Sequence, residues 1–253
     1  MLKHRVIPCL LLRNVGLVKT HKFANPKYVG DPINAIRVFN EKEVDELLVL
    51  DIDASKKNRE PNYELIEQFA GECFMPLAYG GGITTVDQVK RLFSIGVEKV
   101  SLQTSALANL NLVTEIALRY GNQSVVMSID IKKNLLGRHK LYSSATGKIL
   151  EQDWLELIRR AIDAGAGEIL LNAVDRDGTM SGMDLALIER AASVCSVPLI
   201  AVGGVGNLAD IKAAVDVGAS AVAAGAFFVY HGPHRAVLIT YPKYNELINL
   251  LDA

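Results

Sequence analysis

Several apolar runs in this chain of 253 residues end in groups that could transfer protons or bind charged ligands. Aspartates end three of the runs, as Asp51 in DID, Asp130 in SID and Asp177 in DRDG. A carboxylate can act as a general acid or base where its pKa suits the step. Two other runs end in glycines, which can bring backbone N–H groups close to a phosphate. The first run, VIPCLLLRN, ends in leucines instead, so it offers neither chemistry.

The glycine-rich loops predict a phosphate site at each of two opposite poles. Gly80–Gly82 follows the third predicted strand and Gly203–Gly204 the seventh, and a helix is predicted after each loop. A helix N-terminus favours the negative charge of a phosphate. Two sites predict a long ligand with a phosphate at each end, whereas the alternative is that the glycines only make tight turns. The predicted phosphate-binding residues are Gly81, Gly82, Thr104, Gly203, Gly204 and Gly225.

A regular alternation of strands and helices would position these residues. Apolar runs predict strands at Arg5–Leu11, Glu46–Ile52, Pro76–Tyr79, Lys99–Gln103, Ser124–Ile129, Glu168–Asn172, Leu199–Val202 and Ala221–Ala224. Helical periodicity falls at Asp87–Ile95, Leu110–Tyr120, Trp154–Ala164, Leu185–Val194 and Leu208–Val217. Parallel strands buried on both faces form such continuous apolar runs. The pattern predicts a (β/α)8 TIM barrel with its functional face at the C-terminal ends of the strands; a doubly wound open sheet is the alternative.

The chain also repeats itself at about half its length. Segments that begin at Asp45, Pro76 and Glu98 resemble segments that begin at Gly167, Pro198 and Ala219, which lie 122, 122 and 121 residues later. Agreeing offsets predict two fused half-barrels. No linker signature marks the join, so residues 1–253 are predicted to form one domain.

Composition excludes several functional classes. The net charge of −1 gives no indication of a nucleic-acid or anionic-membrane partner. No apolar run approaches the length of about 18 residues that a membrane span requires, and the N-terminal residues do not resemble a signal peptide. Cys9, Cys73 and Cys195 are scattered in apolar contexts, so free thiols in the cytoplasm are expected, with no metal site and no cofactor.

Motifs along nearly the whole chain resemble the cyclase subunit (HisF family) of imidazole glycerol phosphate synthase. They are RVIPCL, the GDP at Gly30–Pro32, DELLVLDIDAS, the GGGI at Gly80–Ile83, EKVSLQTSA, SIDIK, GAGEILLNAVDRDGTMSG and PLIAVGGVG. DRDGT followed by SG is specific to this family and its sugar-isomerase relative, and GAGEILL favours the cyclase. The resemblance implies a barrel that takes ammonia from a glutaminase. The barrel then converts a ribulosyl aminoimidazole carboxamide nucleotide (PRFAR) to imidazole glycerol phosphate and AICAR.

The resemblance implies two catalytic aspartates, of which this chain retains one. Asp130 matches, although a structural aspartate is the alternative, and Asp177 keeps a family position and is a second candidate. Leu11 stands where the other aspartate belongs, and leucine has no group that titrates. Asp51 and Asp53 could replace it only with a different substrate pose.

Other departures fall at the same end of the predicted barrel. Gln103 replaces a usual Asn, and Val202 and Ala226 each replace a Ser. These changes imply that the chain binds a different ligand or binds the family's ligand more weakly. They leave open whether the chain is an active cyclase. The segment after the first strand keeps Lys19 and Phe23 of the family's catalytic loop, and its alternative interpretation is an ordinary mobile lid.

Charged residues begin four of the predicted strands. Two are positive and two are negative, so they could close into a ring of ion pairs at the N-terminal end of the barrel. The resemblance implies that they form the gate through which ammonia enters, whereas the alternative is that each is solvated. Glu98 would lie beside them and suits docking of a partner. The four predicted gate residues are Arg5, Glu46, Lys99 and Glu168.

The sequence supports three hypotheses. The first is a barrel that forms a heterodimer with a HisH-like glutaminase and passes ammonia to a third protein, an amidotransferase, for acetamidino formation on a surface-polysaccharide (lipopolysaccharide O-antigen) sugar. Relatives of the cyclase subunit with such a role are known. The second is a true cyclase of histidine biosynthesis that tolerates Leu11. The third is a scaffold that stimulates a glutaminase without conducting ammonia. A phosphorylated small molecule is the expected ligand in the first two cases.

Overall fold

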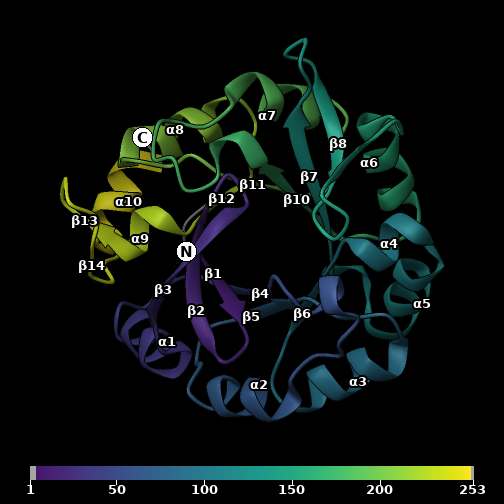
Figure 1. The fold of residues 1–253 in the computed structure, drawn as a ribbon, viewed down its shortest axis with the longest axis horizontal. Coiled ribbons are helices and arrows are strands. Elements are labelled where there is room, and N and C mark those ends of the chain that lie inside the picture. The colour runs from purple at the N-terminus through teal and green to yellow at the C-terminus, as the bar shows by residue number, and fades with distance from the viewer. Residues whose placement is uncertain (1–3, 252–253) are drawn as a thin grey trace.

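The computed structural model describes residues 4–251 and shows a closed barrel of eight parallel strands (Figure 1). Parallel neighbours pair around the ring, and the pairing of β10 with β7 and of β12 with β1 closes it. Closure excludes the open sheet and confirms the predicted (β/α)8 fold. The ends of the predicted domain, residues 1–3 and 252–253, lie outside the described residues. The barrel strands are β1 (Arg5–Arg13), β4 (Leu47–Asp51), β5 (Leu77–Gly80), β6 (Lys99–Leu102), β7 (Val125–Lys133), β10 (Glu168–Ala173), β11 (Leu199–Val202) and β12 (Ala221–Ala224).

Helices surround the barrel (Figure 1). All five predicted helices are present within a few residues of their expected ends, while α1 and α2 were not predicted. Helix α1 begins where the Asp31 side chain accepts from the Asn34 N–H and Pro32 occupies the first turn. The helices are α1 (Pro32–Glu41), α2 (Tyr63–Ala70), α3 (Val86–Ser94), α4 (Thr104–Ala108), α5 (Asn111–Tyr120), α6 (Trp154–Asp163), α7 (Leu185–Ala192), α8 (Leu208–Asp216), α9 (Ala226–Val229) and α10 (Tyr244–Leu251). None of the helices described is long and apolar enough to cross a membrane.

Short antiparallel strands extend two of the loops. β2 (Gly16–His21) pairs with β1 and with β3 (Ala24–Gly30), so the segment expected as a loop after the first strand is a hairpin. β8 (His139–Ser143) pairs with the end of β7 and with β9 (Lys148–Leu150). A further small hairpin joins β13 (Tyr230–His231) to β14 (Ala236–Val237).

The two halves of the barrel repeat details of local geometry. Helix α3 begins with a capping box formed by Thr85 and Gln88, and α8 begins with one formed by Asn207 and Asp210. Each box lies directly after a glycine loop. The same cap 122 residues apart supports the predicted origin of the fold in two half-barrels.

Alternate residues of the strands build two apolar layers. One set, which includes Tyr79 of β5, packs against the helices and shares an apolar cluster with helix residues such as Phe39 of α1 and Phe69 of α2. The other set faces the barrel axis and contains Ile7, Cys9, Leu11, Val18, Leu48, Ala78, Val126, Leu170, Ile200, Ala221 and Ala223. Burial on both faces explains why the strands read as continuous apolar runs.

Candidate functional site

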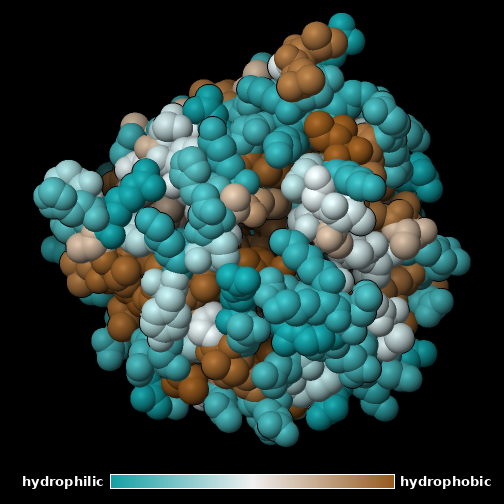
Figure 2. Space-filling view, viewed as in Figure 1, coloured by the Kyte–Doolittle hydropathy of each residue, from teal (hydrophilic) through white to brown (hydrophobic). Residues whose placement is uncertain are grey.

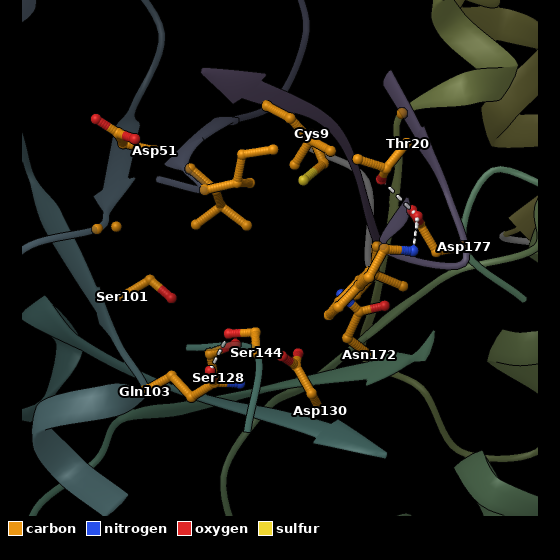
Figure 3. A pocket seen from close by; sticks show the side chains of 18 of the residues that line it. Cys9, Thr20, Asp51, Ser101, Gln103, Ser128, Asp130, Ser144, Asn172 and Asp177 are labelled. Carbon is orange, nitrogen blue, oxygen red and sulfur yellow. Dashed lines mark hydrogen bonds between the residues drawn. The ribbon is translucent and has the colours of Figure 1, made fainter. Parts of the chain in front are cut away.

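A cavity opens at the C-terminal ends of the barrel strands (Figure 3). Asp51, Asp130 and Asp177 line it, and all of the predicted phosphate-binding residues do so as well. The structure therefore brings together side chains and loops from both halves of the sequence. The predicted phosphate-binding residues that line the cavity are Gly81, Gly82, Thr104, Gly203, Gly204 and Gly225.

Asp130 lies on β7, and its side chain is buried at the cavity. Burial raises the pKa of Asp130 to about 7, although Gln103 and Ser144 nearby favour the charged form and partly offset that effect. Ser144 Oγ in turn donates a hydrogen bond to Gln103 Oε1. A carboxyl group with this pKa is partly protonated near neutral pH, so it can both donate and accept a proton.

Asp177 has a structural task that the sequence did not indicate. Its Oδ2 accepts a hydrogen bond from Thr20 Oγ1 at 2.6 Å and another from the Phe23 N–H at 3.1 Å (Figure 3). The Lys22 N–H donates to the Asp177 carbonyl at 2.9 Å. Asp177 therefore fastens the β2–β3 hairpin to the loop after β10, and the hairpin is held over the cavity.

The aspartates after β4 are also committed to local structure. Asp51 Oδ1 accepts from the backbone N–H groups of Asp53 and Ala54 at 2.9 and 3.0 Å. Asp53 does not line the cavity; its Oδ2 lies 2.6 Å from Lys57 Nζ and 3.3 Å from Arg13 Nε. Local contacts therefore orient both carboxylates, and Asp51 is the one of the two that lines the cavity.

Asn172 is a cavity residue that the sequence analysis missed. It sits beside Asp130 in the β10–β7 register, and its Oδ1 is buried without a hydrogen-bond partner among the described residues. Ser128, two residues before Asp130 on β7, lines the same side of the cavity (Figure 3). Because side chains alternate along a strand, Asn172 in LLNA and Ser128 in MSID both face the barrel axis. A polar residue at an axial position of an apolar strand was the feature of the sequence that could have identified each of them.

Lys19 brings a positive charge into the cavity. Its side chain is buried, and Nζ donates to the Cys9 carbonyl at 3.4 Å. Within residues 4–251, Lys19 forms no ion pair with a carboxylate, and its Nζ lies against Gly225, where an added Cβ would approach it to 1.8 Å. An ammonium group in this setting favours an anionic ligand.

The glycine loops have a steric requirement of their own. Gly82 has φ +74°, and an added Cβ would meet the Arg59 carbonyl at 2.4 Å. Gly204 has φ +105°, and its Cβ would meet the Gly182 carbonyl at 2.3 Å. Tight turns therefore account for these glycines, and the same turns leave backbone groups facing the cavity.

The opposite end of the barrel holds the four predicted gate residues in a closed ring. Lys99 Nζ lies 2.9 Å from Glu46 and 3.2 Å from Glu168. Arg5 contacts Glu46 and lies 2.8 Å from Glu168. Both glutamates are buried, so each negative charge is balanced by two positive groups rather than by water. Glu98 is exposed beside this ring.

Comparison with known proteins identifies the family of this chain. Residues 5–234 match the family model described as "Histidine biosynthesis protein". The chain belongs to this family. It is 56% identical to the "Putative imidazole glycerol phosphate synthase subunit hisF2" of Pseudomonas aeruginosa, over 98% of this chain and 99% of that protein. It is 50% identical to the "Putative imidazole glycerol phosphate synthase subunit HisF" of Leptospira interrogans, over 96% of each. It is 39% identical to the "Imidazole glycerol phosphate synthase subunit HisF" of Streptococcus sanguinis, over 92% of each.

These relatives confirm the resemblance seen in the sequence, and the chain is a divergent paralogue within the HisF family. At the position where the family resemblance implies an aspartate, Leu11 is only 8% exposed and packs into the axial apolar cluster. It pairs in register with Leu50 of β4, and Leu50, Ile52 and Val202 pack against the same cluster. Leu11 and Leu50 are thus apolar where β1 and β4 face the cavity of this HisF-family member, whereas Ser128, Asp130 and Asn172 on β7 and β10 are polar.

Proposed function

We propose that this chain receives ammonia from a partner glutaminase and passes it to an amidotransferase reaction on a surface-polysaccharide sugar. One contrast carries the proposal. The charge ring at the N-terminal end of the barrel is complete, whereas Leu11 removes an acid–base group from the other end. A barrel that admits ammonia but lacks part of the cyclisation machinery suits delivery of ammonia better than ring closure.

The axial lining supports conduction of a neutral molecule. Ala78, Ala221 and Ala223 are small, and the remaining axial cluster is hydrocarbon or thiol. Uncharged ammonia loses far less solvation than ammonium in such surroundings. Ser101 and Ser128 line the cavity above this cluster and offer hydroxyls to an emerging molecule. In this scheme Arg5, Glu46, Lys99 and Glu168 form the gate.

The partners follow from the two ends of the barrel. The glutaminase would dock at the floor, next to Glu98 and the ring, and form a heterodimer in the cytoplasm with the single domain 1–253. At the mouth, Lys19 and the two glycine loops would hold a phosphorylated small molecule. A third protein would receive the ammonia and form the acetamidino group.

A second function is supported by one observation. The pKa of Asp130, raised to about 7 by burial, suits a general acid and base. If Asp130 works alone or with Asp177, the chain would be a true cyclase that converts PRFAR and ammonia to imidazole glycerol phosphate and AICAR. Against this, Thr20 and Phe23 already use the Asp177 carboxylate, and Leu11 cannot transfer a proton.

Transfer of labelled nitrogen tests the proposed function. The chain, its glutaminase, a sugar amidotransferase from the same organism and the sugar nucleotide are incubated with amide-15N glutamine and excess unlabelled ammonium. Channelled ammonia places 15N in the acetamidino group despite the dilution. Label that is diluted to the level of the bulk ammonium would contradict the proposal.

A variant that narrows the axis separates conduction from scaffolding. Ala223 is fully buried in the axial cluster, so Ala223→Leu should block passage while glutamine hydrolysis continues. A pure scaffold would transfer 15N equally well with and without this substitution.

A further inference from the structure

The hairpin between β7 and β8 presents two leucines to solvent. Leu135 is 106% exposed and Leu136 is 76% exposed. The hairpin extends beyond the outline of the barrel in Figure 1, and its tip is the apolar group at the top of Figure 2. Two adjacent leucines exposed on a protruding tip form a larger apolar group than the single exposed side chains found on most protein surfaces.

The tip is an ordered turn. Asn134 Oδ1 accepts from the backbone N–H groups of Leu136 and Arg138 at 3.0 and 2.9 Å. The Asn134 N–H donates to the Arg138 carbonyl at 3.0 Å. Gly137 has φ +73°, which a tight turn requires at that point. These bonds hold both leucine side chains outward, so little order has to be gained when they bind a partner.

The arms of the hairpin are fixed to the barrel rim. His139 Nε2 and Lys133 Nζ lie 3.0 and 2.7 Å from Asp184 Oδ2, and Asp184 Oδ1 accepts from the Leu187 N–H to cap α7. Because Asp184 is the N-cap residue of α7, these contacts fix the hairpin at a defined angle to the barrel.

The charge around the leucines is positive. No Asp or Glu occurs between Ile131 and Leu150, which is unusual in a chain with a net charge of −1. Lys133 and Lys140 pair with acidic side chains outside the hairpin, whereas Arg138, two residues after Leu136, forms no ion pair within residues 4–251. The complementary surface is therefore an apolar pocket with acidic residues at its rim.

The base of the hairpin belongs to the cavity. Asp130 pairs with Tyr142 at the foot of its two strands, and Ser144, directly after β8, lines the cavity with Asp130. A protein seated on the tip would thus stand beside the outlet for ammonia.

We propose that the Leu135–Leu136 tip is the docking site for the amidotransferase that accepts the ammonia. This inference rests on the proposed function, because delivery without loss to water requires the acceptor to cover the outlet. Val15, at the β1–β2 turn, and Tyr28, on β3, are also exposed at this end of the barrel, but on the side of the mouth opposite the hairpin. A membrane would bind the tip but would leave the outlet without an acceptor.

Binding of purified proteins tests the docking site. The complex of this chain with its glutaminase is titrated with a sugar amidotransferase from the same organism. The double variant Leu135→Ser/Leu136→Ser should weaken binding by about tenfold or more, since buried interface anchors commonly contribute that much. Leu118→Ser is the matched control, because Leu118 is 84% exposed on α5, away from the hairpin, and this variant should bind as the wild type does.

Each other outcome overturns the inference in a recognisable way. Equal binding by the wild type and the double variant refutes the docking site but leaves the proposed function standing if 15N transfer persists. If the wild type neither binds the amidotransferase nor transfers 15N, both the docking site and the proposed function are refuted. Binding of the wild type, but not of the double variant, to vesicles of phosphatidylglycerol and phosphatidylcholine, with no binding to the amidotransferase, would assign the tip to a membrane surface instead.

Discussion

Replacement of Asp130 by Asn should make the protein more stable in a manner that depends on pH. Burial raises the pKa of Asp130 from its ordinary value of 3.8 to about 7. Between these values the unfolded chain has released the proton while the folded chain retains it, so stability falls as pH rises through this window. Since each pKa step is worth 1.36 kcal/mol, the penalty at pH 8 is about 4 kcal/mol. At pH 5.5 it is about 2 kcal/mol, and below pH 3.8 it vanishes.

The assay is urea unfolding of the wild type and Asp130→Asn at pH 4.5, 5.5, 7 and 8. The stability of the variant relative to the wild type should increase steadily up to pH 7 and then level off. Asp163→Asn, on the exposed face of α6, controls for the loss of an aspartate and should show no such trend. A difference between Asp130→Asn and the wild type that is constant over the range would refute the assignment of Asp130 as the buried group that titrates near neutrality.

Three further substitutions, the last with a control variant, test the proposed gate, the mouth and the glycine loops. Lys99→Met leaves the two buried glutamates of the ring with Arg5 alone and should lower the free energy of unfolding by about 3 kcal/mol; an unchanged urea midpoint would show that the ring is not formed. Leu11→Asp buries a carboxylate among apolar side chains and should lower stability by about 2–4 kcal/mol, while raising imidazole glycerol phosphate formation by about 10²-fold. No gain in that rate would mean that Leu11 is not what limits cyclisation. Gly204→Ala should lower stability by about 3 kcal/mol because φ is +105° and the Cβ meets a carbonyl at 2.3 Å, whereas Gly137→Ala, at φ +73° with nothing within 4 Å, should cost only about 1 kcal/mol. Equal losses of stability for Gly204→Ala and Gly137→Ala in thermal unfolding would refute the steric argument.

The barrel could be predicted because its strands are buried on both faces. Runs such as Leu199–Val202 contain no polar residue, and the structure begins and ends β11 at those residues. The short strands β2, β3, β8 and β9 were missed because they mix polar and apolar residues. Of these, β3 and β9 are largely exposed and are stabilised mainly by pairing with a neighbouring strand. The positions of the barrel strands could therefore be predicted, whereas the short antiparallel strands in the loops could not.

The candidate site could be predicted at the level of position but not of contact. Strand starts and strand ends placed Lys99 at one end of the axis and Asp130 at the other, because alternation fixes which residues face inward. The tasks of Asp51 and Asp177 depend on hydrogen bonds to backbone groups of loops, which no spacing in the sequence reveals. The unpartnered oxygen of Asn172 likewise emerges only from packing.

On the proposed function, this barrel admits ammonia but does not close the imidazole ring efficiently. The most direct test is the rate at which the purified chain and its glutaminase form imidazole glycerol phosphate from the ribulosyl nucleotide and glutamine. The HisF subunit of Streptococcus sanguinis, paired with its own glutaminase, serves as the reference. Because general acid–base catalysis contributes about 10²–10⁴ in rate, we expect glutamine hydrolysis with imidazole formation at least about 10²-fold below the reference. Formation at the reference rate, abolished by Asp130→Asn, would contradict the account.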